Sequence, residues 1–291
     1  MKRMGLMLGT CVLIGSMVAV AQEQEQMGPP KVLAVIREYT KPGRNGTSHE
    51  KTEAAFVQAM ARAKSPTHYL AVESVSGKPR ALFFTGYDSF EAWEKDVQSV
   101  EKNAVLSAAL DRANAADGEL LDSTDAAALV LRPELSLRTD FDIPHMRYFE
   151  ISSYHVRLGH DNEWEELVKM YQKGCDNLPD CHWAMYQAVY GLDDGTYIVF
   201  NPMKSAAEID RNFGVMKSFS DALGEDGMKR LAELTAAIVE SSQTNLFMFN
   251  PRMSYAPEEW IKADPDFWKP KASMAESKKP TPKPAEKPAG Q

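Results

Sequence analysis

The sequence lacks the short motifs that identify common enzyme classes. It contains no Walker loop, no G-x-G-x-x-G fingerprint and no G-x-S-x-G nucleophile elbow. It also contains no H-x-x-x-H or C-x-x-C pair with the spacing of metal ligands. Asp193-Asp194-Gly195 lacks the further oxygen ligands of a calcium loop and predicts a turn. We therefore assign no cofactor and no metal site from motifs.

Positive charge is scarce as well. The chain has 33 Lys and Arg against 41 Asp and Glu, which gives a net charge of −8. Residues 1–21 hold only Lys2 and Arg3 as charged residues, so the remainder is more negative still. A surface of this sign repels phosphate backbones and anionic lipid headgroups. We expect no nucleic acid as a partner.

Long apolar runs are absent except at the N-terminus. The run Met4–Val20 follows a basic start and ends in Ala19-Val20-Ala21. This pattern predicts a secretory signal peptide over 1–21. An uncleaved anchor is the alternative, although the run is short for a membrane span. We expect an exported chain, periplasmic or extracellular, with no transmembrane span after signal cleavage.

Cysteine is rare, and one of the three residues lies in the predicted signal peptide. The two others, Cys175 and Cys181, are close in sequence and form a disulfide candidate in an exported protein. Such a small loop would restrict the unfolded chain by roughly 2 kcal/mol. Two buried free thiols are the alternative.

The most regular pattern is the stretch 182–200, which is rich in aromatic and β-branched residues around a central Gly/Asp turn. It predicts a β-hairpin. A similar segment lies upstream at 68–84. Four pairs of residues match between the two segments: His68 with His182, Val75 with Val189, Gly77 with Gly191, and Phe84 with Phe200. The chain is therefore interpreted as a tandem duplication.

Each copy has the same predicted order of elements. In the first copy we expect a strand at 32–39, a helix at 47–64, a hairpin at 67–86, a helix capped by Ser89, a helical stretch at 103–117 and a strand at 126–132. In the second copy we expect a strand at 147–157, a helix at 162–174, the hairpin, a helix capped by Ser205, a helix at 225–241 and a strand at 246–249. Thr47 and Glu50 have the spacing of a capping box.

The order β-α-β-β-α-β predicts an α+β fold of two ferredoxin-like repeats. Each antiparallel sheet carries helices on one face, and its other face is too apolar to stay exposed to solvent. We expect the two open faces to pack sheet to sheet, so that the chain is a monomer with an internal pseudo-dimer.

The predicted boundaries follow composition. They are a signal peptide (1–21), a disordered leader (22–30), a first repeat (31–136), a linker (137–146), a second repeat (147–255), a C-terminal docking segment (256–270) and a disordered Lys/Pro-rich tail (271–291).

The doubled order, together with Tyr154-His-Val-Arg-Leu-Gly-His160 leading into Trp164, resembles the dimeric α+β barrel superfamily. That group includes antibiotic-biosynthesis monooxygenase-like domains, NIPSNAP-like domains and haem-binding chlorite dismutase relatives. The resemblance implies a barrel with a shared interior over about 31–255. It leaves open whether the chain is a cofactor-free oxygenase, a haem protein or a domain without chemistry.

Histidines are the candidate catalytic residues. His155 ends the first strand of the second copy, where a neutral imidazole could act as a base or a haem ligand. His182 and His68 open the second strand of each copy and could line the mouth of the interior. A solvated strand-end histidine is the alternative for all three. His49 and His160 lie at helix starts, where a local hydrogen bond is expected.

Aromatic side chains supply the candidate ligand-binding residues. Tyr154, Trp183 and Tyr186, with His68, could form the walls of a pocket, and a place in the core is their alternative. Two hypotheses follow. The first is an exported protein that binds a small apolar or aromatic ligand between its two sheets. The second is a cofactor-free monooxygenase-like enzyme, or a haem-binding relative, with His155 or His182 in the pocket.

Overall fold

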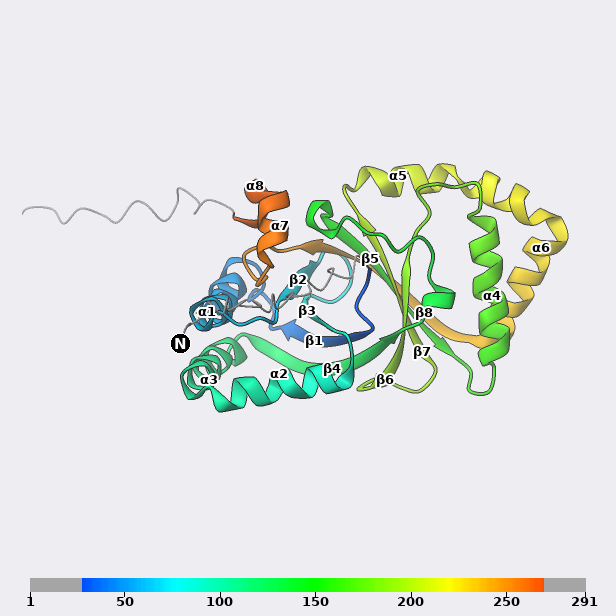
Figure 1. Cartoon of the computed structure of the whole chain (residues 1–291). Helices are drawn as coiled ribbons and strands as arrows, with labels where there is room; N and C mark the ends of the chain where they lie inside the picture. Colours follow the sequence, from blue (N-terminus) through cyan, green and yellow to red (C-terminus); the bar gives the residue numbers. More distant parts are fainter. Residues whose placement is uncertain (1–27, 270–291) are drawn as a thin grey trace, which may run out of the picture.

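The computed structural model describes residues 28–269, which form one closed barrel of eight antiparallel strands with helices outside it (Figure 1). The first repeat contains β1 (Val32–Thr40), α1 (Thr47–Ala63), β2 (Tyr69–Ser74), β3 (Arg80–Tyr87), α2 (Phe90–Lys102), α3 (Ala104–Gly118) and β4 (Leu121–Leu131). The second contains β5 (Tyr148–Val156), α4 (Asp161–Gly174), β6 (Ala184–Tyr190), β7 (Thr196–Met203), α5 (Ala207–Gly214), α6 (Met216–Ile238) and β8 (Val239–Phe249).

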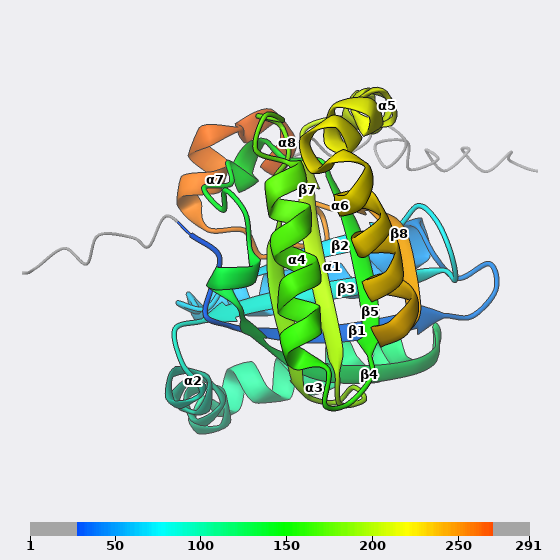
Figure 2. The same ribbon diagram turned by 90° about the vertical axis from the view of Figure 1, so that its right-hand side faces the viewer.

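The barrel closes where the two repeats meet. Strands follow the order β1-β3-β2-β8-β5-β7-β6-β4, so β2 pairs with β8 and β6 pairs with β4 across the repeats. Helices of the first repeat and of the second cover opposite outer surfaces, and Figure 2 shows α4 and α6 lying over the strands of the second repeat. The predicted pair of ferredoxin-like repeats, packed sheet to sheet, is confirmed.

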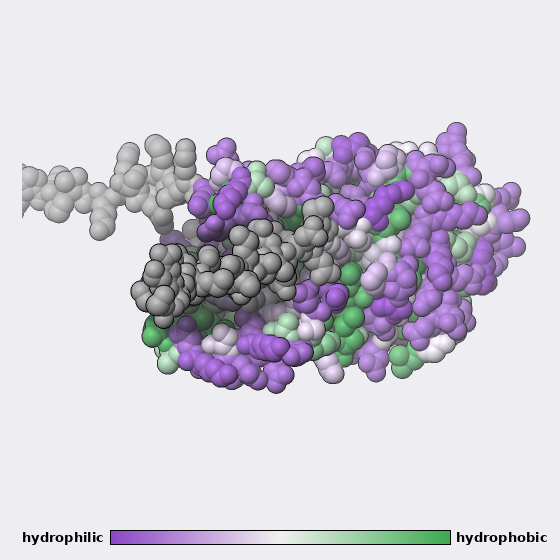
Figure 3. Space-filling view, in the orientation of Figure 1, coloured by the Kyte–Doolittle hydropathy of each residue, from purple (hydrophilic) through white to green (hydrophobic). Residues whose placement is uncertain are grey.

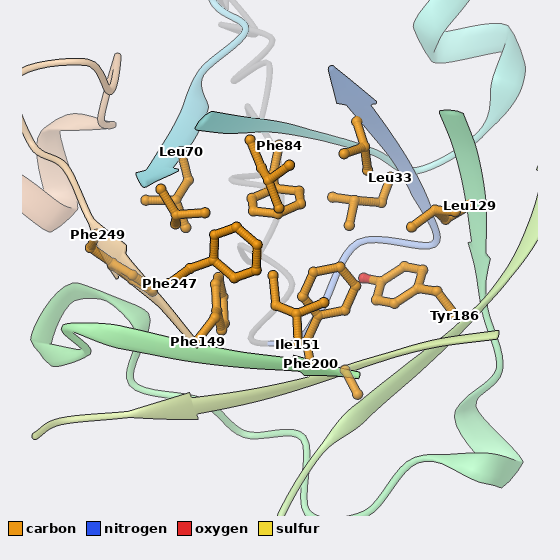
Figure 4. Packing of buried hydrophobic residues seen from close by; sticks show 14 of the residues in the cluster. Leu33, Leu70, Phe84, Leu129, Phe149, Ile151, Tyr186, Phe200, Phe247 and Phe249 are labelled. Atoms are coloured by element: carbon orange, nitrogen blue, oxygen red, sulfur yellow. The ribbon is translucent and has the colours of Figure 1, made fainter. Parts of the chain in front are cut away.

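Strand alternation explains why the barrel has a core. Leu33 and Val35 of β1 point inward, as do Leu82 and Phe84 of β3, and their neighbours along each strand face the helices. Figure 4 shows the inward side chains from both repeats meeting in one apolar cluster. On the surface seen in Figure 3, hydrophilic residues predominate among those that are coloured.

The last strand of each repeat is longer than its apolar pattern predicts. We expected strands at 126–132 and 246–249, but β4 begins at Leu121 and β8 begins at Val239. The added residues are mostly polar and exposed, yet they pair with β1 and β5 through backbone hydrogen bonds. Where both faces of a strand are exposed to solvent, the sequence shows no hydrophobic alternation from which the strand could be predicted.

Two predicted helix caps are wrong. Helix α1 follows Gly46, whose φ of 73° suits glycine, and no side chain caps it. Helix α5 has no side-chain cap either, and Glu208 accepts a hydrogen bond from the Lys204 backbone N–H instead of a cap by Ser205. The Ser89 cap of α2 is confirmed, because its hydroxyl accepts from Ala92 N at 3.1 Å.

A C-terminal segment folds back over one end of the barrel. It contains α7 (Glu258–Ala263) and α8 (Pro265–Trp268). Trp268 is buried and donates from Nε1 to Pro144 O at 2.9 Å. Arg147 at the start of the second repeat pairs with Asp264. This end of the barrel is therefore walled by residues distant in sequence.

Three predicted segments fall partly or wholly outside the described residues: the signal peptide, most of the leader and the Lys/Pro-rich tail. Between residues 28 and 269, no helix is both long enough and apolar enough to cross a membrane.

Candidate functional site

A large cavity lies at the mouth of the barrel, under the C-terminal segment. Its volume is about 870 Å³. The inner wall consists of core side chains that point toward one another in Figure 4, and it includes Leu33, Leu70, Phe84, Phe149, Tyr186 and Phe200. The outer wall comes from residues 28–30, 139–144 and 257–263. A site of this size and composition suits a small apolar molecule. We call it the mouth cavity.

The charged residues that line the mouth cavity are all acidic, although Lys204 and His145 contact one of them, Asp142, from outside the lining. Asp88, Asp140, Asp142 and Glu259 line the cavity, and no Lys or Arg does so among the described residues. Carboxylates repel an anionic ligand and favour a neutral or positively charged one. This rim therefore limits the class of molecule that can enter.

Tyr186 connects the inner wall to the N-terminal side of the cavity. Its hydroxyl donates to Pro30 O at 2.8 Å. Burial raises the pKa of Tyr186 far above its ordinary value, so the hydroxyl remains a donor. The sequence placed Tyr186 among ligand-binding residues, and the structure places it on the cavity wall.

His68 is the one histidine of residues 28–269 that lines the mouth cavity. Its ring stacks on Tyr255 with centroids 4.5 Å apart, and its Nδ1 donates to Tyr255 O at 3.1 Å. In the neutral ring this leaves Nε2 as an acceptor. The arrangement provides one base beside a largely apolar chamber.

A second cavity, of about 350 Å³, lies outside the barrel between the sheet of the second repeat and its helices. We call it the outer pocket. Tyr154 and Trp183 line it, so these two predicted ligand-binding residues are separated from His68 and Tyr186 by the sheet. Trp183 donates from Nε1 to Leu135 O at 2.7 Å, and the Tyr154 ring lies 5.3 Å from Trp164.

Cys175 and Cys181 are joined by a disulfide beside the outer pocket, with Cα atoms 5.8 Å apart. Arg138, which precedes the second repeat, donates to backbone carbonyls throughout this loop. This role of Arg138 leaves no signal in the local sequence, because the contact joins segments about forty residues apart in the chain.

The two candidate catalytic histidines, His155 and His182, do not lie in one site. His182 lines the outer pocket, and its Nε2 donates to Pro202 O at 2.7 Å. His155 lies at the end of the barrel opposite the mouth cavity, with Nε2 3.3 Å from Glu240 Oε2. The side chain of His155 is about a third exposed and lines neither cavity.

Neither cavity shows a ready haem site. Among residues 28–269 the lining of the mouth cavity holds no Lys or Arg that could pair with haem propionates, and the nearby Lys204 already pairs with the rim residue Asp142. In the outer pocket, the Nε2 atom of His182 is already used by a backbone carbonyl.

A group of buried titratable side chains lies on the outer face of the first repeat, away from both cavities. Burial opposes charge on His49, but hydrogen bonds to Asp117 and Glu38 outweigh it and raise the pKa of His49 to about 10. Burial, followed by the charges of Glu38 and Asp117, raises the pKa of Glu53 to about 9. These carboxylates were not among the residues predicted from the sequence, although Glu53 stands four residues after His49 on one helix.

No family model matches the sequence, and no curated protein does either. Solved structures do match. A candidate monooxygenase from Fusobacterium nucleatum aligns with a TM-score of 0.51 at 12% identity, over 75% of this chain and 91% of that one. A candidate monooxygenase from Lactobacillus acidophilus aligns at 0.46 and 8% identity, over 75% and 94% of the two chains.

A mutant chlorite dismutase from Candidatus Nitrospira defluvii aligns with a TM-score of 0.46 at 10% identity, over 82% and 98%. At these identities the likeness shows the fold alone, and the Fusobacterium structure carries that argument. With its eight-stranded barrel closed by two repeats, the chain has the dimeric α+β barrel fold, and both halves belong to one polypeptide.

Proposed function

We propose that this is an exported protein that binds a small aromatic or apolar ligand, neutral or positively charged, in the mouth cavity. The observation that carries the proposal is the chemistry of the cavity wall. Apolar rings form its interior, and carboxylates form its rim. Burial of an aromatic ring against Phe84, Phe149 and Phe200 supplies affinity, and the rim selects against anions.

The few polar groups inside give the ligand an orientation. His68 offers an acceptor at Nε2, and Tyr186 offers its hydroxyl. A ligand hydroxyl or amine could donate to His68 while its ring packs on the phenylalanines. A phenol or an aromatic amine fits this combination.

Binding is tested with two related probes on the purified chain. N-phenyl-1-naphthylamine is neutral, whereas 1-anilinonaphthalene-8-sulfonate adds a negative charge to a similar ring system. The proposal expects the neutral probe to bind more tightly.

Two variants locate the binding site. Ala263→Trp, at the exposed rim of the cavity, should weaken binding of the neutral probe, and Ala115→Trp on exposed α3 should not. Equal binding of the neutral probe to both variants contradicts the proposal.

Export rests on the basic start, apolar run and A-x-A site of residues 1–21. Expression of the full chain in a bacterium, followed by N-terminal sequencing of the periplasmic fraction, tests this part separately. The proposal expects the exported chain to begin at Gln22. Recovery of the uncleaved chain from the cytoplasmic fraction contradicts export but leaves the binding result unaffected.

A cofactor-free monooxygenase-like reaction is the second candidate function, and the position of His68 favours it. Oxidation of an electron-rich phenol by O₂ is assisted by removal of the substrate proton, which His68 Nε2 could accept. The structure does not favour His155 or His182 for this role, since neither lines the mouth cavity. Oxygen uptake with a panel of hydroquinones that is abolished by His68→Gln, with probe binding retained, would support the enzyme.

A further inference from the structure

Four metal-ligating side chains converge beneath the helices of the first repeat. Glu38 comes from the outer face of β1, His49 and Glu53 lie one turn apart on α1, and Asp117 lies in the last turn of α3. His49, Glu53 and Asp117 are at most 3% exposed. We call these four residues the acidic histidine cluster.

The atoms of the cluster are spaced as the ligands of one ion would be. His49 Nε2 lies 3.0 Å from Glu38 Oε2, 3.4 Å from Asp117 Oδ1 and 3.9 Å from Glu53 Oε1. One ligand atom of each residue falls within 4.8 Å of all the others. Tetrahedral ligands at 2.0–2.2 Å from a Zn²⁺ ion are about 3.4 Å apart. Small rotamer adjustments would therefore bring all four atoms onto one ion.

One atom of the cluster has no partner. Glu53 Oε1 is buried and accepts no hydrogen bond within residues 28–269, although it faces the other three ligands. A buried carboxylate oxygen is normally satisfied by a donor or a cation. Without a cation the buried Glu53 side chain stays neutral by keeping its proton, and a metal ion that displaces this proton would supply the partner that Oε1 lacks.

Neighbouring groups hold the ligands in place. The Thr52 hydroxyl lies 2.5 Å from Asp117 Oδ1 and 2.9 Å from the carbonyl oxygen of His49. This contact connects α1 to α3 at the cluster. Fixed ligands reduce the entropy that metal binding would otherwise cost.

The second repeat shows that the fold does not require polar residues here. The β1–β3 ladder pairs Val35 with Phe84, and the β5–β7 ladder pairs Ile151 with Phe200, so Glu38 corresponds to Tyr154. The spacing of His49 and Glu53 is matched by that of His160 and Trp164. In the second repeat the rings of Tyr154, Trp164 and Tyr197 pack together at this place.

We propose that Glu38, His49, Glu53 and Asp117 bind one divalent first-row transition metal, for which Zn²⁺ is the natural probe. The imidazole nitrogen favours a first-row transition metal, and four ligand atoms match the coordination number of Zn²⁺, whereas Mg²⁺ and Ca²⁺ prefer six or more oxygens. With four-coordinate Zn²⁺ no position stays open, so the metal would be structural and tie α1 and α3 to β1.

The test uses the purified, untagged chain after treatment with a chelator. Competition against a fluorescent zinc chelator should give one tight site per chain, and Co²⁺ should produce the visible absorption of a tetrahedral centre. Zn²⁺ should raise the melting temperature, whereas Mg²⁺ and Ca²⁺ should not. A folded chain that binds no Zn²⁺ and gives no Co²⁺ band overturns the proposal and makes the cluster an ion-pair network.

Variants assign the site. Glu53→Gln and His49→Gln should each weaken Zn²⁺ binding by about tenfold or more. Glu38→Gln tests the least buried ligand if the other variants fail to fold. His160→Gln in the second repeat is the matched control and should leave binding unchanged. Tight, equimolar Zn²⁺ binding that survives folded Glu53→Gln and Glu38→Gln places the metal elsewhere and overturns the proposal.

Discussion

Phe84 and Phe200, which are equivalent residues of the two repeats, pack edge to face inside the barrel with ring centroids 5.4 Å apart. The sequence pairs them by similarity, and the structure brings them into contact (Figure 4). Both also line the mouth cavity. The internal duplication thus builds the core and the cavity wall from the same pair of residues.

Truncation of Phe84 should be costly. Phe84→Ala removes a buried ring that contacts Phe149 and Phe200, and we expect the free energy of unfolding to fall by about 3–5 kcal/mol. Phe213→Ala, at a side chain that is 78% exposed, should change stability by about 0.5 kcal/mol or less. Urea denaturation measures both variants, and similar losses for the two would contradict the packing described here.

The first repeat alone should not remain a folded monomer. A fragment that ends at residue 146 loses the β2–β8 and β4–β6 ladders and exposes the inward face of its sheet. We expect it to self-associate into a dimer or to aggregate, whereas the full chain should be a monomer. Light scattering coupled to size-exclusion chromatography distinguishes these outcomes. A stable, monomeric fragment would show that the repeats are independent domains.

Arg138 should stabilise the disulfide loop beyond the effect of the disulfide itself. Its guanidinium donates at 2.8–3.3 Å to the carbonyl oxygens of Cys175, Asp176, Leu178 and Cys181. We expect Arg138→Ala to lower the free energy of unfolding by about 2 kcal/mol. Arg157→Ala removes only a 4.0 Å exposed contact with Glu240 and should cost about 0–1 kcal/mol. Chemical denaturation under oxidising conditions tests the difference.

Stability of the metal-free protein should fall as the pH rises above neutrality. The pKa of Glu53 is raised from 4.5 to about 9, and that of His49 is raised from 6.5 to about 10. Over this interval the folded chain holds protons that the unfolded chain has released, so each rise in pH favours unfolding. The groups that face Glu53 and His49 are the carboxyl groups of Glu38 on β1 and Asp117 on α3, and the phenol of Tyr69 on β2.

With chelator present, the urea midpoint should therefore be higher at about pH 6 than at about pH 9. Glu53→Gln should flatten the part of this dependence that ends near pH 9 and leave the part due to His49. A midpoint that rises across the interval would contradict the protonation states assigned to the cluster.

The architecture was predictable because both repeats of the sequence carry the same pattern of strands, helices and turns. Each repeat has apolar alternation strong enough to mark its strands, and matched residues such as Gly77 and Gly191 fix the hairpin turns, where both adopt φ of 77°. Strand period and chain order suffice for these features. They do not suffice for the histidines, because His68 lines the mouth cavity whereas its counterpart His182 lines the outer pocket.

The division of the candidate site was not predictable. Tyr154 and His155 are neighbours in sequence, yet alternation puts Tyr154 under the helices and His155 on the inward side at the far end of the barrel. The outer wall of the mouth cavity comes from segments whose path depends on tertiary contacts such as that of Arg147 with Asp264. No local pattern encodes contacts between residues so distant in the chain.

The most direct test of the account is a crystal of the protein soaked with 1-bromonaphthalene, a neutral ring whose bromine is located by anomalous scattering. We predict one strong bromine peak inside the barrel mouth, among Leu33, Phe84 and Phe149. Its loss in Ala263→Trp crystals would confirm the entrance. A peak confined to the outer pocket, or none in crystals of the unaltered chain, would contradict the claim that the mouth cavity binds the ligand.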